Sequence, residues 1–556
     1  MNDVQDRAAS IALHRTWHRR YVTQAILAIA MLLSSPLIAQ ETPDRFDILL
    51  EGGIVHRGDG SEPFPGSIGI RGQKIHVLPV STVAASTAAM LADVHIDCRG
   101  LVICPGFIDL HTHSDDTVVE KNTRAGVNYL LQGCTTMVTG NCGFGPVDTD
   151  KYLRQITNDG SGTNIAHLIP QGSLRSEVIG KGDRTPTAEE LQKMKDLADK
   201  AMKDGAYGMT TGLIYIPGTL TKTEELIEIA KIVGNNKGIY ASHIRNEGGE
   251  LLASVDEAIR IGRESGCRVH VSHFKASGRE NWGTLRLAIE RIEQARAAGE
   301  LVTADQYPYT ASSTSLEATL LPAWAREGGR DELKKRLTDG ETAKKIQADV
   351  EESLAKASRI QLASCNWNRA WIGKSLEELA KAQNRPTVEI VLEIERNGGA
   401  SVINFGMNEE DMRLAMPLPW VATASDGGSK IPTSSMPHPR SFGTFPRKIG
   451  HYSIEENVLS LAAAIRSSSG LPAEILGMSD RGLLKDGYWA DIVVFDPDTF
   501  RDRATYESPY LTPSGIRHVL VNGTFAVYEG QATGAMAGKA LRKSGANTDS
   551  TESKEK

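Results

Sequence analysis

A repeated order of short apolar segments and amphipathic stretches in the middle of the chain constrains the fold most. The apolar segments are Thr135–Thr139, Ile165–Ile169, Tyr207–Thr210, Ile239–Ser242, Val269–Ser272 and Val302–Ala304. The amphipathic stretches are Ala188–Asp204, Glu224–Val233, Leu251–Glu264 and Thr284–Ala297. Because strands that alternate with helices form a parallel sheet covered by helices, this order predicts an α/β protein. About seven or eight such units favour a closed (β/α)8 TIM-like barrel over an open sheet.

Both ends of the chain carry a different, strand-rich pattern without helical periodicity. Its segments are Asp47–Leu50, Gly66–Ile70, Lys74–Val77, Val94–Asp97, Ala490–Asp496 and Val519–Gly523. We therefore expect a small β-sandwich domain built from residues 41–103 and 480–543, flanking a barrel over residues 104–479. A charge-rich helical stretch, Ala323–Ala357, interrupts the barrel pattern and predicts an inserted helical subdomain at about 312–370. The polar residues 544–556 are expected to form a disordered tail.

The N-terminus is typical of a secretory signal. Arginines at positions 7, 15, 19 and 20 precede the apolar stretch Ala25–Ala39, which ends in small residues. This stretch is shorter than the roughly 20 residues of a spanning helix, so we expect cleavage near Ala39 or Gln40 and a periplasmic or secreted protein. An uncleaved membrane anchor is the alternative, and after cleavage we expect no stable membrane insertion.

Cysteine content and net charge limit which classes of protein the chain can belong to. A domain of this size does not need disulfide bonds, so we expect buried thiols at every cysteine except Cys142. The net charge of −7 gives no basic footprint for a nucleic-acid partner.

A pair of histidines after an apolar run is the first chemical signal. Leu101–Cys104 leads into Pro105–Asp115, which contains His111 and His113. Side chains on a strand alternate between its faces, so these two imidazoles point the same way and can bind one divalent metal. A His-x-His pair taken alone is more often incidental, so the interpretation depends on partners elsewhere.

Further ligand types occur at the ends of other predicted barrel strands. His243 follows Tyr240–Ser242, His273 follows Val269–Ser272, and Asp426 follows Val421–Ser425. Barrel active sites lie at the carboxyl ends of the strands, so these residues are expected to converge. Cys142 lies in a glycine-rich turn after another strand, and a thiolate there suits zinc and can bridge two metals.

With these motifs the chain resembles the amidohydrolase superfamily and, within it, the N-acyl-D-amino-acid deacylases. The resembling segments are Pro105–Asp115, Gly140–Gly145, Gly212–Tyr215, Ser242–Gly248, Ser272–Lys275, Asp305–Tyr309, Ser425–Gly427 and His438–Arg447. The resemblance implies one tightly bound Zn²⁺ on Cys142, His243 and His273. It also implies a second, weaker position on His111, His113 and Asp426. The sequence departs from the family at Pro170-Gln171, where relatives carry Gly-His, which bears on substrate preference.

The resemblance also implies roles at the site. Asp426 would accept a proton from the attacking water and return it to the leaving amine, while Tyr215 would help to polarise the amide carbonyl. Lys275 has the same strand parity as His273, and with Tyr307 and Arg440 it would bind the free carboxylate of the substrate.

Other charged residues near these motifs are expected to be structural. Strand alternation places His270 on the face opposite His273, so we assign it a structural role. Arg245 and Glu247 are close in sequence and could pair with each other, so neither is assigned a catalytic role.

The sequence therefore predicts an exported, zinc-dependent hydrolase of N-acyl-D-amino acids or other D-configured peptide-like amides, with a small-molecule substrate that has a free carboxylate. One alternative is another amidohydrolase activity, on dipeptides or cyclic amides. The other is a metal- or ligand-binding protein that has lost catalysis.

Overall fold

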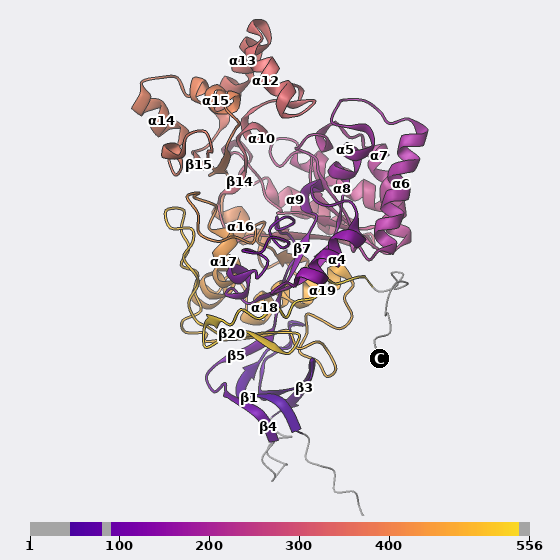
Figure 1. Ribbon diagram of the computed structural model, residues 1–556, viewed down its shortest axis with the longest axis vertical. Coiled ribbons are helices and arrows are strands. Elements are labelled where there is room, and N and C mark those ends of the chain that lie inside the picture. Colours follow the sequence, from indigo (N-terminus) through magenta and orange to yellow (C-terminus); the bar gives the residue numbers. More distant parts are fainter. Residues whose placement is uncertain (1–44, 80–90, 544–556) are drawn as a thin grey trace, which may run out of the picture.

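The computed structural model describes residues 45–79 and 91–543. The predicted signal sequence, 1–40, and the predicted tail, 544–556, lie outside the described residues. Along its long axis, which is vertical in Figure 1, the molecule has a β-rich end, a central barrel and a mainly helical end.

Strands from both ends of the chain form one nine-stranded sheet. Its order is β21-β20-β19-β18-β5-β1-β2-β3, and β4 also pairs with β1. Their bounds are β1 (Arg45–Val55), β2 (Phe64–Arg71), β3 (Lys74–Pro79), β4 (Leu91–Asp97), β5 (Val102–Pro105), β18 (Ile492–Phe495), β19 (Ile516–Val521), β20 (Thr524–Tyr528) and β21 (Gln531–Ala532). The junction is the antiparallel pair of β5 and β18, in which Ile492 lies opposite Pro105. This pairing joins segments that are almost four hundred residues apart in sequence.

The central part is a closed parallel barrel. Its strands are β6 (Phe107–Asp109), β7 (Cys134–Thr139), β8 (Asn164–His167), β9 (Ile169–Pro170), β10 (Gly208–Gly212), β11 (Ile239–His243), β12 (Arg268–Val271), β13 (Val302–Gln306) and β17 (Val421–Thr423). β8 and β9 are separated only by Leu168 and occupy one position in the ring. A parallel bridge between Thr112 and Gly427 joins the first strand to the last beyond their regular ends.

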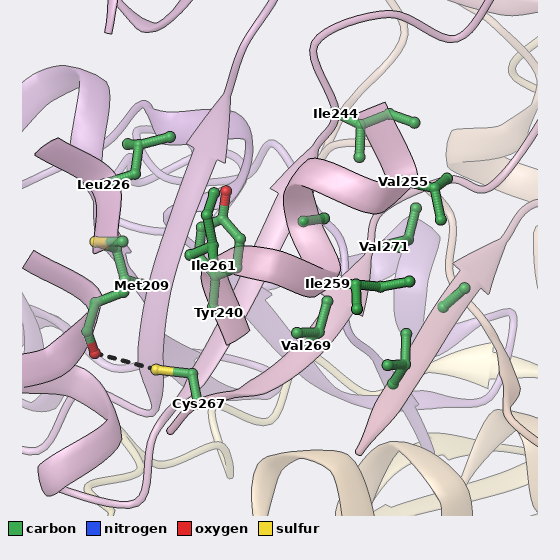
Figure 2. Packing of buried hydrophobic residues seen from close by; sticks show 14 of the residues in the cluster. Met209, Leu226, Tyr240, Ile244, Val255, Ile259, Ile261, Cys267, Val269 and Val271 are labelled. Carbon is green, nitrogen blue, oxygen red and sulfur yellow. Dashed lines mark hydrogen bonds between the residues drawn. The ribbon is translucent and has the colours of Figure 1, made fainter. Parts of the chain in front are cut away.

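Helices outside the barrel bury an apolar layer against its strands. They include α4 (Thr149–Asp159), α5 (Gln171–Ile179), α6 (Ala188–Lys203), α7 (Thr223–Asn235), α8 (Leu251–Ser265) and α9 (Leu285–Ala297). In α8, Val255, Ile259 and Gly262 recur at helical spacing on the buried face. Figure 2 shows Val255 and Ile259 near Val269 and Val271 of β12, within the largest core cluster. The predicted TIM-like barrel is confirmed.

The C-terminal part of the barrel region is mainly helical. It contains α16 (Glu409–Ala415), α17 (Arg440–Pro446), the π-helix η5 (Arg447–Glu455), α18 (Leu461–Ser468) and α19 (Gly470–Leu476). A short helix, α3 (Val127–Leu130), precedes β7.

The insertion is larger than the sequence indicated and contains a sheet. Its strands β14 (Ser312–Ser315), β16 (Ser401–Asn404) and β15 (Ile360–Ser364) are antiparallel in that order. Its helices are α10 (Leu316–Leu320), α11 (Ala323–Arg326), α12 (Arg330–Thr338), α13 (Gly340–Lys356), α14 (Leu376–Gln383) and α15 (Thr387–Arg396). They share a separate core that extends to Val402. A search for apolar alternation misses β14, because it is built of serines and a threonine.

All six cysteines have free, buried thiols, which confirms the expectation for the five other than Cys142. Cys142, which was expected to differ from them, is buried as well. Within the described ranges, the search for a helix with the length and apolarity to span a bilayer finds none.

Candidate metal centre

Six predicted ligands come together at the carboxyl ends of the barrel strands. His111 and His113 follow β6, His243 is the last residue of β11, and His273 follows β12 by two residues. Cys142 lies in the 3-10 turn η1 (Asn141–Gly143) after β7. Asp426 follows β17, and its backbone amide donates to the carbonyl of His111 at 2.8 Å. The hydrogen bonds that close the barrel therefore also fix the separation of the ligands.

The sulfur of Cys142 lies at the centre of three imidazoles. Its distances are 3.3 Å to His111 Nε2, 3.7 Å to His243 Nδ1 and 3.8 Å to His273 Nε2. Zinc bonds of about 2.3 Å to sulfur and about 2.0 Å to nitrogen place tetrahedral ligands about 3.5 Å apart. The spacing and the sulfur–nitrogen donor set therefore fit a zinc ion.

A carboxylate group adjoins this cluster. Asp426 Oδ1 lies 3.0 Å from His113 Nε2 and 3.5 Å from His111 Nε2. His111 is thus shared, because it belongs to a compact group with Cys142 and His273 and to another with His113 and Asp426. The family resemblance implied two sets of three ligands, with His111 in one and Cys142 in the other. In the structure His111 contacts Cys142, so the two sets adjoin.

Three of the ligands have left-handed backbone, which is uncommon outside glycine. The φ angles are 51° for Cys142, 37° for His273 and 50° for Asp426. Non-glycine residues in this region carry a conformational cost of order 1–3 kcal/mol and cluster at functional sites. At each of these three positions the chain turns sharply after a strand, which directs the side chain over the barrel.

Electrostatics favour the ionised form of two ligands. Burial would raise the pKa of the Cys142 thiol, but His111 and the other imidazoles hold it well below its ordinary value. Burial would likewise raise the pKa of Asp426, but Arg440 and His111 hold it well below its usual range. Thiolate and carboxylate are the forms that bind a metal.

Asp305, at the end of β13, supports the ligands from inside the barrel. Its Oδ2 lies 2.8 Å from His270 Nε2 and 3.5 Å from His111 Nδ1, and its Oδ1 accepts from the His273 amide at 2.7 Å. The placement of His270 on the opposite face was wrong. Val269 and Val271 pack outside the barrel, so His270 points inward, and the left-handed turn at His273 ends the strand alternation.

Glu247, on the loop after β11, contacts the ligands from the cavity side. Its Oε1 lies 2.9 Å from His273 Nδ1 and 2.5 Å from Lys275 Nζ. The suggested pair of Arg245 with Glu247 was wrong, because Arg245 instead contacts Glu257 of α8 at 2.8 Å.

A cavity of about 630 Å³ opens over the metal ligands and separates the barrel from the insertion. Tyr215 and Lys275 line it beside His113, Cys142, His243, His273 and Asp426. The Tyr215 hydroxyl is 2.8 Å from Thr314 Oγ1 of β14, and its ring packs edge-on against His243. The far wall is mostly uncharged and polar, with Ser312, Thr319, Ser353, Ser358 and Asn404 from the insertion.

Two predicted substrate-binding residues, Arg440 and Tyr307, are not among the residues that line the cavity. Arg440 Nη1 is 2.8 Å from Asp426 Oδ2, and its guanidinium lies 4.8 Å from the centre of the Tyr307 ring. The Tyr307 hydroxyl is directed toward Met407 Sδ at 3.5 Å. The structure thus brings Arg440 to Asp426, and it does not place the Tyr307 hydroxyl at the cavity.

Sequence reasoning missed Asp305 and gave Glu247 no role. Asp305 follows the apolar run Val302–Ala304, which is the same pattern of strand and polar residue that identified His243. Glu247 lies four residues beyond His243 on a loop, so no periodic pattern marks it.

Comparison with known proteins gives consistent relatives over nearly the whole chain. The model of the amidohydrolase family matches residues 95–527. The D-aminoacylase of Alcaligenes xylosoxydans xylosoxydans is 33% identical over 92% of this chain and 100% of that protein. The N-acyl-D-glutamate deacylase of the same organism is 32% identical over 90% of this chain and 97% of that protein.

Solved structures agree with this. A D-aminoacylase crystal structure matches with a TM-score of 0.77 and 33% identity over 90% of this chain and 100% of that one. The N-acyl-D-glutamate deacylase of Bordetella bronchiseptica, solved with zinc and a phosphonate inhibitor that mimics the tetrahedral intermediate, matches with a TM-score of 0.76. It is 30% identical over 90% of this chain and 100% of that one.

Proposed function

We propose, since the chain belongs to the amidohydrolase family and its N-acyl-D-amino-acid deacylase branch, that it hydrolyses N-acyl-D-amino acids to a carboxylate and a free D-amino acid. The observation that carries this proposal is the Cys142 thiolate among three imidazoles, beside Asp426 and beneath a cavity that contains Lys275. Deacylases of known structure share this fold over their whole length.

The metal and the protein divide the chemistry between them. Zinc held by Cys142, His243 and His273 would supply Lewis acidity, which activates water and polarises the amide carbonyl. Asp426 is ionised, so it can accept the proton of the attacking water and return it to the leaving amine nitrogen as the C–N bond breaks. Arg440 forms an ion pair with Oδ2 of Asp426, whereas Oδ1 of Asp426 faces the imidazole of His113.

Two cavity residues fit the remaining parts of the substrate. The ring of Tyr215 packs against the ligand His243, and its hydroxyl, which contacts Thr314 Oγ1, can donate to the developing oxyanion. The buried ammonium of Lys275 lines the cavity beside the metal ligand His273, and it suits a free carboxylate. Arg440 and Tyr307 remain predicted carboxylate-binding residues, and for that role Arg440 would share its charge with Asp426.

We also propose that the protein is exported. The basic and apolar pattern before Gln40 supports this proposal. Expression of the full chain with cell fractionation, followed by N-terminal sequencing of the mature protein, tests it. A mature N-terminus near Gln40 in the exported fraction is expected, and an intact N-terminus in the membrane fraction would contradict it.

The test of activity is hydrolysis of N-acetyl-D- and N-acetyl-L-amino-acid panels by the zinc-loaded mature protein, with metal content measured on the same sample. We expect release of D-amino acids that is lost on chelation and restored by zinc. Bound zinc without turnover of any acyl-amino acid would refute the deacylase proposal and redirect the search to other amides.

A further inference from the structure

Glu247 occupies the space between the metal ligands and the cavity. Its Oε1 lies 2.9 Å from His273 Nδ1 and 2.5 Å from Lys275 Nζ, and its Oε2 lies 4.0 Å from His243 Nε2. One carboxylate therefore faces two metal-ligand histidines and the cavity lysine at the same time.

The hydrogen-bonding capacities of these groups make Glu247 the acceptor of the arrangement. His273 directs Nε2 at Cys142 Sγ. For Nε2 to bind the metal, the ring proton must be on Nδ1, and Nδ1 can then only donate a hydrogen bond. Lys275 Nζ lies 2.8 Å from the same Nδ1 and also can only donate. Of the three groups only the carboxylate accepts, and its Oε1 lies within reach of both donors, which are close enough to repel each other without it.

His243 has the corresponding orientation on its other side. It directs Nδ1 at Cys142 Sγ, and its buried Nε2 makes no hydrogen bond within the described part of the chain. Glu247 Oε2 faces this nitrogen, and a shift of about 1 Å would complete a hydrogen bond of normal length.

The same contact determines how Lys275 meets a ligand. Its ammonium has three hydrogens, and two are directed at Glu247 Oε1 and at the His273 carbonyl, which is 3.0 Å away. One N–H is left for the carboxylate of a substrate in the cavity. The carboxylate of Glu247 thus aims the lysine as well as the imidazoles.

We infer that Glu247 is a positioning residue that fixes the metal-binding tautomers of His243 and His273 and, through the same oxygen atoms, aims Lys275 at the substrate. The part that concerns Lys275 rests on the proposed function, whereas the part that concerns the imidazoles rests only on zinc binding. Removal of a carboxylate that orients a ligating imidazole typically weakens metal affinity by 10- to 100-fold.

Zinc affinity tests the first part without any turnover. Zinc-loaded parent, Glu247→Gln and Glu250→Gln proteins are titrated with a competing chelator. Glu250 lies exposed on the same loop and is not among the residues that line the cavity, so its variant is a matched control for the loss of charge. We expect affinity about 10- to 100-fold weaker for Glu247→Gln and unchanged for Glu250→Gln. Cobalt-substituted protein should show an altered absorption spectrum for Glu247→Gln alone.

Kinetics at saturating zinc test the second part. We expect KM for an N-acetyl-D-amino acid to rise at least several-fold in Glu247→Gln, and to rise much less for the matching amide, which lacks the carboxylate. Parental zinc affinity in a folded Glu247→Gln protein would overturn the inference even if the parent is a deacylase. Weaker zinc binding in Glu247→Gln, combined with a parent protein that has no deacylase activity, would support the imidazole role and refute the proposed function instead.

A conservative variant covers the case in which Glu247→Gln does not fold. Glu247→Asp keeps the charge but withdraws the carboxylate by one methylene, so zinc affinity between that of the parent and that of a metal-ligand variant is expected. Parental affinity in Glu247→Asp would overturn the inference.

Discussion

Lys448 in the π-helix η5 offers a direct test of the energetics of burial. The side chain is 1% exposed, and its Nζ donates to the Met416 carbonyl at 3.2 Å. Burial lowers the pKa of Lys448 from 10.5 to about 7. Between pH 7 and pH 10.5, Lys448 is therefore protonated in the unfolded chain and mostly neutral in the folded protein. The free energy of unfolding consequently falls as the pH decreases through that range.

The magnitude follows from the pKa difference. At about 1.4 kcal/mol for each pH unit, the drop from 10.5 to about 7 amounts to about 5 kcal/mol of destabilisation at or below neutral pH. Lys448→Met removes this cost but also removes the hydrogen bond to Met416, which is worth about 1 kcal/mol. We expect Lys448→Met to stabilise the protein by a few kcal/mol at pH 7, with a smaller gain at pH 8 and a still smaller one at pH 9.

Urea unfolding of the zinc-loaded proteins, followed by tryptophan fluorescence at these three pH values, measures the difference. Comparing variant with parent at each pH cancels the contributions of zinc and of other titrating groups. Lys334→Met, which changes an exposed lysine of α12, is the matched control and should show little difference at any of the three. A Lys448→Met protein that is less stable than the parent at pH 7, or a difference independent of pH, would refute the reasoning.

The metal centre yields three further predictions. Cys142→Ser should lose most bound zinc, measured by metal analysis after dialysis, because a neutral hydroxyl replaces the shared thiolate; zinc retained at the parental level would contradict the central role of the sulfur. Asp426→Asn should lower kcat at least 100-fold while the zinc on the cysteine side remains, and a parental rate would eliminate the assignment of the base. Asp305→Asn should weaken zinc binding about 10-fold in a chelator titration, because Asp305 holds His111 and the His273 amide, and unchanged affinity would reduce it to a packing role.

Much of the site could be predicted because it follows a simple rule of the barrel. Polar residues at the ends of parallel strands meet at one edge, so His111, Cys142, His243 and Asp426 were recognisable as a set, although none of them was diagnostic alone. The rule failed where the backbone departs from a strand. His273 itself has left-handed backbone, and strand parity counted back from it misplaced His270.

Interactions across loops could not be predicted in this way. Arg245 pairs with Glu257, which is twelve residues away on the next helix, rather than with its near neighbour Glu247. The choice depends on how α8 packs against the barrel, which sequence spacing does not encode. Strand β14 of the insertion escaped notice for a related reason, since it pairs with β16 and has no apolar side chains.

The arrangement also separates the origin of the chemistry from that of specificity. The metal ligands come from barrel strand ends, where backbone hydrogen bonds such as that from Asp426 to His111 fix them rigidly. The opposite wall of the cavity comes from the insertion, and there Ser358 Oγ and Asn404 Oδ1 are buried without a hydrogen-bond partner in the described structure. Buried polar atoms without partners are costly, so a substrate group that hydrogen-bonds to them gains more than an apolar group of the same size. Side-chain preference should therefore change with substitutions in the insertion, while zinc binding should not.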